Sequence, residues 1–130
     1  MRELTRHWLN AAEDDLKVIG LIIDRPDLTH LTAFHSQQAI EKCFKSVIEE
    51  YQIKLSRTHN LQFLYSSIEK LLNITIDVRI LSELDALYID SRYPGSLGLL
   101  PSGKPTLQDA KLFYLTAKDI HSTIITFLQK

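Results

Sequence analysis

Prolines and glycines, the residues that most often interrupt helices, are concentrated in one segment of this chain. Of the four Pro and four Gly among the 130 residues, three of each lie in RYPGSLGLLPSGKP, residues 92–105. Elsewhere apolar residues recur every three or four positions, as on the buried face of an α-helix. No stretch of any length alternates apolar and polar residues as a strand does. We therefore expect an all-α protein with one long loop.

Five segments carry the helical spacing. The first helix is expected from about Glu3 to Asp24, broken before Pro26, and the second includes residues 34–46 and ends near Tyr51. The third is expected to be capped by Thr58 or Asn60, and the last to start at Thr106, with Asp109 placed almost as in a capping box. The fourth should carry on one face Ile76, Ile80, Leu84, Leu87 and Tyr88. The connections are short, apart from the long loop. This favours an antiparallel up-down bundle of about five helices, forming a single domain over residues 1–130.

Composition excludes several classes of protein. The net charge is −1, with 45% hydrophobic and 24% charged residues, as in a globular domain that is not coated in basic side chains. The single cysteine, Cys43, excludes an intrachain disulfide and a cysteine-rich metal site. The first 16 residues carry charges among their apolar positions, unlike a signal peptide or a membrane span. We expect a cytoplasmic protein that binds no metal and no other cofactor.

The predicted second helix, FHSQQAIEKCFKS, carries an amide within its apolar face. Its apolar arc consists of Ala33, Ile40, Cys43, Phe44, Val47 and Ile48. Gln37 falls in the middle of this arc, and Glu41 falls at its edge. Burying an amide costs about 1 kcal/mol or more unless it is hydrogen-bonded. Gln37 is therefore expected either to bond to a neighbouring segment inside the core or to form the wall of a site.

Acidic residues are missing from two connecting regions. Neither residues 51–68 nor residues 91–108 contain Asp or Glu. If successive helices alternate in direction, these regions lie at the same end of the bundle, where the third and fifth helices also begin. Helix N-termini attract anions through their free N–H groups. We expect a cationic end suited to phosphate, although basic residues in loops also serve simply to keep a protein soluble.

Three segments of the chain resemble the HEPN domain (higher eukaryotes and prokaryotes nucleotide-binding). They are FHSQQAIEKCFKSV, RTHNLQFL and LYIDSRYPG, which follow the typical patterns F-H-x-Q-Q-A-x-E-K-x-x-K, R-T-H-x-L and Y-x-x-x-R-Y-P in that order. The residues Trp8, Ala12, Asp15 and Leu16 also fit the family, and the resemblance runs from about Leu4 to Leu128. It implies a five-helix bundle, commonly a homodimer, that often partners a minimal nucleotidyltransferase. Some members belong to toxin–antitoxin pairs.

Nine residues are candidates for binding the phosphate groups, sugars or bases of a nucleotide or RNA. They are Gln38, Glu41, Lys42, Lys45, Arg57, His59, Tyr88, Arg92 and Tyr93. The Lys and Arg side chains would bind phosphates, the tyrosines would stack, Gln38 would read a base edge and Glu41 would orient its basic neighbours. Each has a purely structural alternative, such as a solvated charge or, for His59, packing at a helix start. Trp8 is expected in the core or in a dimer contact.

A further branch of the family consists of metal-independent endoribonucleases, marked by an R-x(4–6)-H motif before the last helix. No His follows Arg92 at that spacing. Arg25 and His30 have the spacing but lie in the first connector, so we regard that match as coincidental. We therefore expect a binding module with no catalytic residues. The alternatives are an endoribonuclease toxin that uses Arg92 and His59, and a protein-interaction scaffold that uses residues 98–100 and the last helix.

Overall fold

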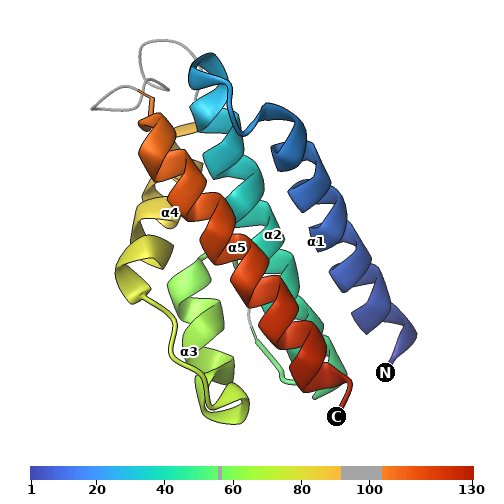
Figure 1. Cartoon of the computed structure of the whole chain (residues 1–130). Helices are drawn as coiled ribbons and strands as arrows, with labels where there is room; N and C mark the ends of the chain where they lie inside the picture. Colours follow the sequence, from blue (N-terminus) through green and yellow to red (C-terminus); the bar gives the residue numbers. More distant parts are fainter. Residues whose placement is uncertain (56, 92–103) are drawn as a thin grey trace.

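The structure, a computed structural model, describes residues 1–55, 57–91 and 104–130 of the chain. Its elements are α1 (Glu3–Ile22), a short 3-10 helix η1 (Pro26–Leu28), α2 (Thr29–Glu50), α3 (Leu61–Leu72), α4 (Val78–Ser91) and α5 (Leu107–Leu128) (Figure 1). These described ranges contain no strand. The expected all-α helical bundle is therefore confirmed. The predicted protein-interaction segment 98–100 and the candidate site residues Arg92 and Tyr93 lie outside the described residues.

Helix α2 lies at the centre of the bundle. It packs against each of the other four α-helices. Several of its apolar residues are fully buried, namely Ile40, Cys43, Phe44 and Val47. Because neighbours surround α2 on several sides, polar residues of the helix are buried as well, and each of them needs a hydrogen-bond partner within the protein.

Local side-chain caps define two of the helix starts. The Oδ1 atom of Asn60 accepts a hydrogen bond of 2.8 Å from the backbone N–H of Phe63, so Asn60 is the N-cap of α3. The Thr58 hydroxyl instead accepts from the N–H of Asn60 at 3.1 Å. At α5 the predicted cap is confirmed, since Thr106 Oγ1 accepts from the N–H of Asp109 at 3.0 Å. Turn residue Asn73, in the left-handed region with φ 50°, ends α3.

Two predicted helix boundaries move by two residues. Helix α1 ends at Ile22, before the predicted Asp24. Helix α4 begins at Val78, so Ile76 precedes the helix although it is buried as expected. The backbone N–H of Ile76 donates to the hydroxyl of Tyr65 at 3.2 Å, which satisfies this buried donor outside the helix.

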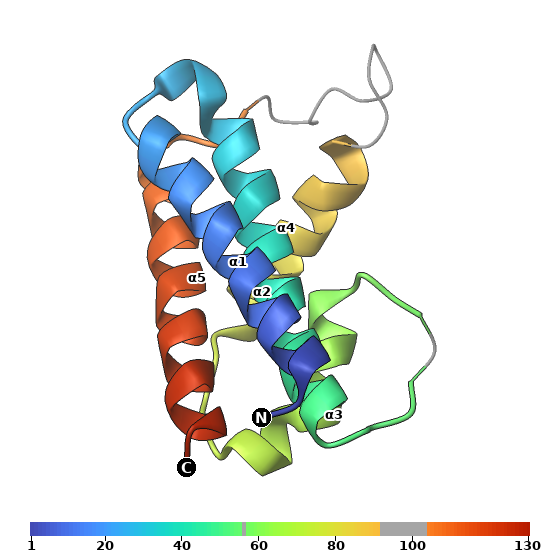
Figure 2. The same cartoon turned by 90° about the vertical axis from the view of Figure 1, so that its right-hand side faces the viewer.

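The first acid-free connector does not share an end of the bundle with Ser91 and Lys104, the described residues that flank the long loop, so that part of the prediction is wrong. After α2, the described connector residues 51–55 and 57–60 turn back beside it, and the backbone carbonyl of His59 accepts a 3.0 Å hydrogen bond from Gln37, partway along α2. Helix α3 therefore starts near the middle of α2 and runs in the same direction (Figure 2). Lys104, the first described residue after the long loop, bonds through Nζ to the carbonyl of Asp27 in η1 at 2.8 Å.

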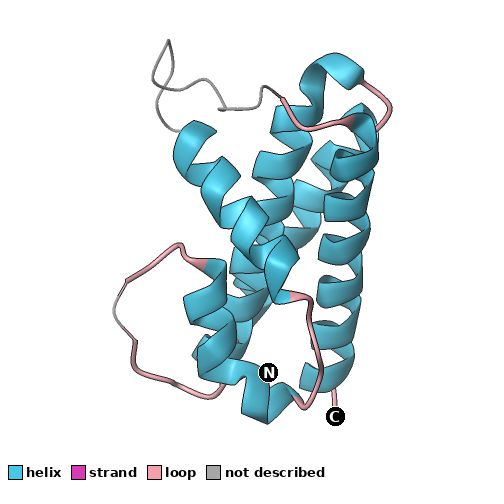
Figure 3. Ribbon diagram, turned by 90° about the vertical axis from the view of Figure 1, so that its left-hand side faces the viewer, coloured by secondary structure: helices cyan, strands magenta, loops and turns pink. Residues whose placement is uncertain are grey.

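The length of the connector explains this reversal. Ten extended residues span up to about 33 Å, whereas Glu41 and Glu50 lie only about 14 Å apart along the helix axis. The connector has apolar residues to bury, because Ile53 and Leu55 pack against the core. Figure 3 shows this loop beside α3 from the opposite side of the molecule. The connector therefore forms one wall of a pocket rather than a simple turn.

Candidate functional site

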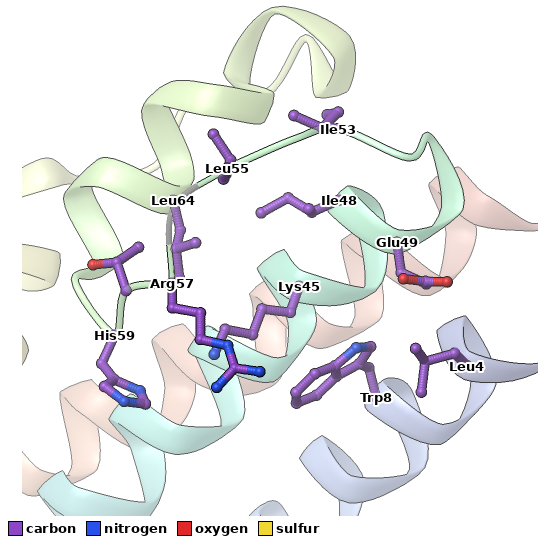
Figure 4. A pocket seen from close by; sticks show the side chains of 11 residues that line it. Leu4, Trp8, Lys45, Ile48, Glu49, Ile53, Leu55, Arg57, His59 and Leu64 are labelled. Atoms are coloured by element: carbon purple, nitrogen blue, oxygen red, sulfur yellow. The ribbon is translucent and has the colours of Figure 1, made fainter.

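A pocket lies where the returning connector faces α1 and α2. Its volume is about 520 Å³, within the range of small-molecule sites. The lining residues come from four separate segments: Leu4 and Trp8 of α1; Lys45, Ile48 and Glu49 of α2; Ile53, Leu55, Arg57, Thr58 and His59 of the connector; and Leu64 of α3 (Figure 4). Three of the predicted site residues, Lys45, Arg57 and His59, are thus brought together on one surface.

The carboxylate of Glu41 organises the polar side of this pocket. It is only 4% exposed, yet it accepts hydrogen bonds from Lys45 Nζ at 2.8 Å and from Gln37 Nε2 at 3.2 Å. His59 Nδ1 lies 3.1 Å from each carboxylate oxygen. A buried carboxylate is costly unless its partners supply compensating charge and hydrogen bonds. We refer to Glu41, Lys45, His59 and Gln37 as the Glu41 network.

Gln37 explains the amide in the apolar face of α2. Its side chain is fully buried, and Nε2 donates to the carbonyl of His59 as well as to Glu41. Its Oε1 accepts a 2.7 Å bond from Gln38 Nε2. The first expectation for Gln37 therefore holds, because it is a hydrogen-bonded core amide. Gln37 does not itself line the pocket, but it fastens the connector that does. Gln38 contacts Gln37 and does not line the pocket.

Arg57 and Trp8 complete the pocket from opposite sides. The guanidinium of Arg57 lies between the imidazole of His59 and the indole of Trp8, with the amino group of Lys45 nearby (Figure 4). Arg57 is exposed and makes no hydrogen bond or ion pair with any residue that the structure describes. Lys45 Nζ lies 5.4 Å from the centroid of the Trp8 ring, at the distance of a cation–π contact. The pocket therefore combines a free cation, a paired cation and an aromatic face.

Lys42 belongs to a different cluster. The 8% exposed carboxylate of Asp15 accepts a 2.7 Å bond from Lys42 Nζ and lies 2.9 Å from Nδ1 of His35. We refer to Asp15, Lys42 and His35 as the Asp15 network. It joins α1 to α2, and none of its members lines the pocket. The structure therefore places Lys42, a predicted phosphate ligand, outside the site.

Tyr88 borders the Glu41 network without lining the pocket. Its ring centroid lies 5.8 Å from that of His59, and it stacks on Phe34 at 6.0 Å. These contacts connect the C-terminal part of α4 to α2 and to the connector. The aromatic residue that does line the pocket is Trp8, which sequence reasoning assigned to the core or to a dimer contact. No local sequence signal places Trp8 there, because its neighbour Lys45, 5.4 Å from the ring centroid, belongs to another helix.

The predicted free N–H groups at the start of α3 are occupied. The N–H groups of Leu61 and Gln62 donate to the carboxylate of Asp85 at 2.8 and 3.3 Å. Burial of Asp85 raises the pKa of its carboxyl above the usual value, the two backbone donors lower it, and the nearby charge of Glu41 raises it further. An anion therefore finds no open donors at the start of α3, and the cationic site is the pocket at the side of the bundle.

The remaining chemistry of the site is limited. Burial, and the negative charge of Asp15, raise the pKa of the Cys43 thiol far above its usual value, so this residue is not a nucleophile. No cluster of three or more His, Cys, Asp or Glu side chains suited to a metal exists within the described ranges. Among the same residues, no helix has the length and apolar character needed to cross a membrane. The geometry supports binding of an anion that also carries an apolar or aromatic part.

Comparisons with known proteins agree with the fold and with the three sequence segments. The family model of the HEPN domain matches residues 5–125. Among solved structures, the protein TT1696 from Thermus thermophilus superposes with a TM-score of 0.75 at 19% sequence identity, covering 97% of this chain and 99% of the other. A comparison with curated proteins finds no significant match. The resemblance predicted from the sequence is confirmed.

Proposed function

The chain belongs to the HEPN domain family, and from this premise we propose that it is a nucleotide- or RNA-binding module. It acts as a homodimer in the cytoplasm, as the partner subunit of a minimal nucleotidyltransferase. The convergence of Lys45, Arg57 and His59 on one pocket carries the binding part of this proposal. The sequence segments shared with the family support the choice of protein partner.

Arg57 is the main phosphate ligand in this proposal. Its planar guanidinium can give two parallel hydrogen bonds to phosphate oxygens, and no described residue competes for it. Lys45 contributes less, because its charge is already shared with Glu41 at 2.8 Å. Glu41 in turn holds Lys45 and His59 in place before the ligand arrives, so less side-chain entropy is lost on binding.

A titration with ATP and with a short RNA at low salt tests the binding. Each charge-assisted hydrogen bond contributes about 1.5–3 kcal/mol, so Arg57→Ala should weaken binding at least about tenfold. Arg79→Ala is the matched control, because Arg79 is an exposed arginine that pairs with Asp77 outside the pocket. Binding should also weaken as salt rises. Absence of binding by the unmodified protein would contradict the proposal.

Co-expression with a minimal nucleotidyltransferase tests the partner. The two proteins should purify as a complex, and Arg57→Glu should abolish nucleotide binding while the complex persists. If Arg57→Glu disrupts the complex but leaves nucleotide binding intact, the pocket is a protein contact. That outcome would favour the scaffold function. Failure of the two proteins to associate would remove the partner from the proposal and leave nucleotide binding to be judged by the titration.

One observation favours an endoribonuclease toxin as a second candidate. The imidazole of His59 is 56% exposed, and Glu41 holds Nδ1, so Nε2 is the nitrogen available for general acid–base chemistry. Arg92, the other residue of this candidate, lies outside the described residues. Purified protein should then degrade RNA, and His59→Ala should stop the reaction. Intact RNA after prolonged incubation would contradict this function.

A further inference from the structure

The pocket has two chemically different sides. Its cationic side consists of Lys45 and Arg57, with Thr58 and His59 beside them; the carboxylate of Glu49, which pairs with Arg2, also lines the pocket. Its apolar side consists of Leu4, Trp8, Ile48, Ile53, Leu55 and Leu64. An inorganic phosphate, or the backbone of a polyanion, would contact only the cationic side and would leave the apolar side in water. A ligand that covers both sides must carry an anionic group and an apolar or aromatic ring within one small molecule.

We infer that the pocket binds a nucleoside phosphate with its base against the indole of Trp8 and its phosphate at Arg57. This inference rests on the proposed function, for which it names the ligand class and the residue that receives the base. Trp8 is the only tryptophan of the chain and comes from α1, whereas the cations come from α2 and the connector. The site therefore exists only when these three segments are packed together.

The size and shape of the site agree with one nucleotide. Its volume of about 520 Å³ exceeds what a phosphate alone would fill and lies within the range of sites for small ligands. In Figure 4 the guanidinium of Arg57 lies beside the indole of Trp8, so a phosphate at Arg57 would leave the attached base within reach of the ring. A tryptophan ring stacks on a base, and such stacking is tolerant of base identity. The pocket should therefore distinguish nucleotides from phosphate much better than it distinguishes one base from another.

The single tryptophan supplies a direct measurement. Titration with AMP or ATP should quench Trp8 fluorescence with a stoichiometry of one ligand per chain. Inorganic tripolyphosphate carries the three phosphate groups of ATP without a base, so it should bind at least about fivefold more weakly than ATP. A parallel titration with a hexanucleotide RNA shows whether the ligand is a free nucleotide or an RNA strand. The hexanucleotide should bind with an affinity similar to that of a single nucleotide, because a single pocket should gain little affinity from additional nucleotides. Equal affinity for ATP and tripolyphosphate would overturn the inference and leave the phosphate-binding function standing.

Two substitutions at Trp8 test the base contact by calorimetry. Trp8→Leu keeps an apolar side chain but removes the ring, so ATP affinity should fall at least about fivefold while tripolyphosphate affinity stays within about twofold. Trp8→Phe should restore most of the loss. The tripolyphosphate control detects any displacement of Lys45, which contacts the ring. Tyr51→Leu, the loss of an exposed aromatic that does not line the pocket, should change neither affinity.

The outcomes separate the inference from the function on which it rests. If Trp8→Leu weakens ATP and tripolyphosphate equally, or weakens neither, the base does not contact Trp8 and the inference is wrong. If Arg57→Ala has no effect on either ligand, the phosphate-binding function fails as well. Loss of ATP affinity in Trp8→Leu, with rescue by Trp8→Phe and unchanged tripolyphosphate binding, would establish the base contact.

Discussion

The Glu41 and Asp15 networks have the same chemistry but different surroundings. Each contains a nearly buried carboxylate, a lysine within 2.8 Å of it and a histidine whose Nδ1 faces the carboxylate. The Asp15 network joins α1 to α2, and its histidine is only 26% exposed. The Glu41 network joins α2 to the connector, and its histidine is 56% exposed beside a pocket in which Arg57 pairs with no described residue. Similar sets of side chains therefore stabilise a helix–helix contact in one place and border an exposed pocket in the other.

This difference shows what makes a polar cluster a candidate site. Charge and hydrogen bonding do not distinguish the two networks, because each satisfies its own carboxylate within the fold. The distinguishing features are an adjacent cavity and a cation, Arg57, that has no partner within the described part of the chain. A ligand at the Asp15 network would have to displace existing ion pairs, whereas a ligand at the pocket can bind Arg57 without breaking one.

The largest expected effect is on stability, and it should be similar in the two networks. Either Glu41→Ala or Asp15→Ala removes the acceptor of a partly buried lysine, which should lower the free energy of unfolding by about 2–3 kcal/mol. Urea unfolding measures this loss. Only Glu41→Ala should also weaken ATP binding, because only Glu41 positions pocket residues. Equal loss of ATP affinity in both variants would break the distinction between the networks.

The next effect concerns Asp85, which supports the Glu41 network alone. It accepts the N–H groups of Leu61 and Gln62 and so holds the end of the connector next to His59. Asp85→Ala should cost about 1–2 kcal/mol, since it removes a cap and leaves buried donors unpaired. Urea unfolding should show this cost, and ATP binding should weaken with it. A destabilised variant that binds ATP normally would mean that the connector does not need this anchor.

The pH dependence of Asp85 has a definite sign. Its pKa in the folded protein is raised above the usual 3.8, so ionisation is less favourable in the folded state than in the unfolded state. Its contribution to stability is therefore fully present below 3.8 and is lost as the pH rises through the folded pKa. Relative to Asp85→Asn, the unmodified protein should lose stability as the pH rises through this range. Unfolding curves for both proteins at several pH values measure it, and parallel profiles would contradict the raised pKa.

Comparing Arg57 in the pocket with Lys42 in the Asp15 network tests whether only the pocket binds ATP. Arg57→Ala should weaken ATP binding about tenfold, whereas Lys42→Ala should change it by no more than about twofold, because Asp15 already holds Lys42. Calorimetry at fixed ionic strength measures both. A loss for Lys42→Ala as large as that for Arg57→Ala would extend the site along α2 to the Asp15 network.

The smallest expected effect concerns the thiol of Cys43, which follows Lys42 in the sequence and is buried in the core. In the folded protein this thiol should hardly react. Burial and the charge of Asp15 raise the pKa of its thiol, so a thiol reagent at mildly alkaline pH should label the folded protein negligibly and the urea-unfolded protein completely. Mass spectrometry measures the labelled fraction. Rapid labelling of the folded protein would mean that α1 and α2 separate readily, and that the Asp15 network does not seal their interface.

The features that the sequence alone determined are those that depend on neighbours along the chain. Helical spacing and the confinement of Pro and Gly predicted the bundle, and the caps at Asn60 and Thr106 lie within three residues of the groups they satisfy. The three family segments identified the HEPN domain. The favourable spacing of Glu41 and Lys45 was also visible, since residues four apart share a helix face.

The tertiary structure alone decided where the site lies. The connector could have crossed the end of the bundle, but burial of Ile53 and Leu55 and the bond from Gln37 to His59 turn it back along α2. Asp85, 24 residues from Leu61, then accepts the backbone N–H group of Leu61, which was predicted to be free for an anion. Contacts between residues this far apart in the chain depend on the path of the whole backbone. For that reason neither the pocket nor the place of Trp8 in it follows from local spacing.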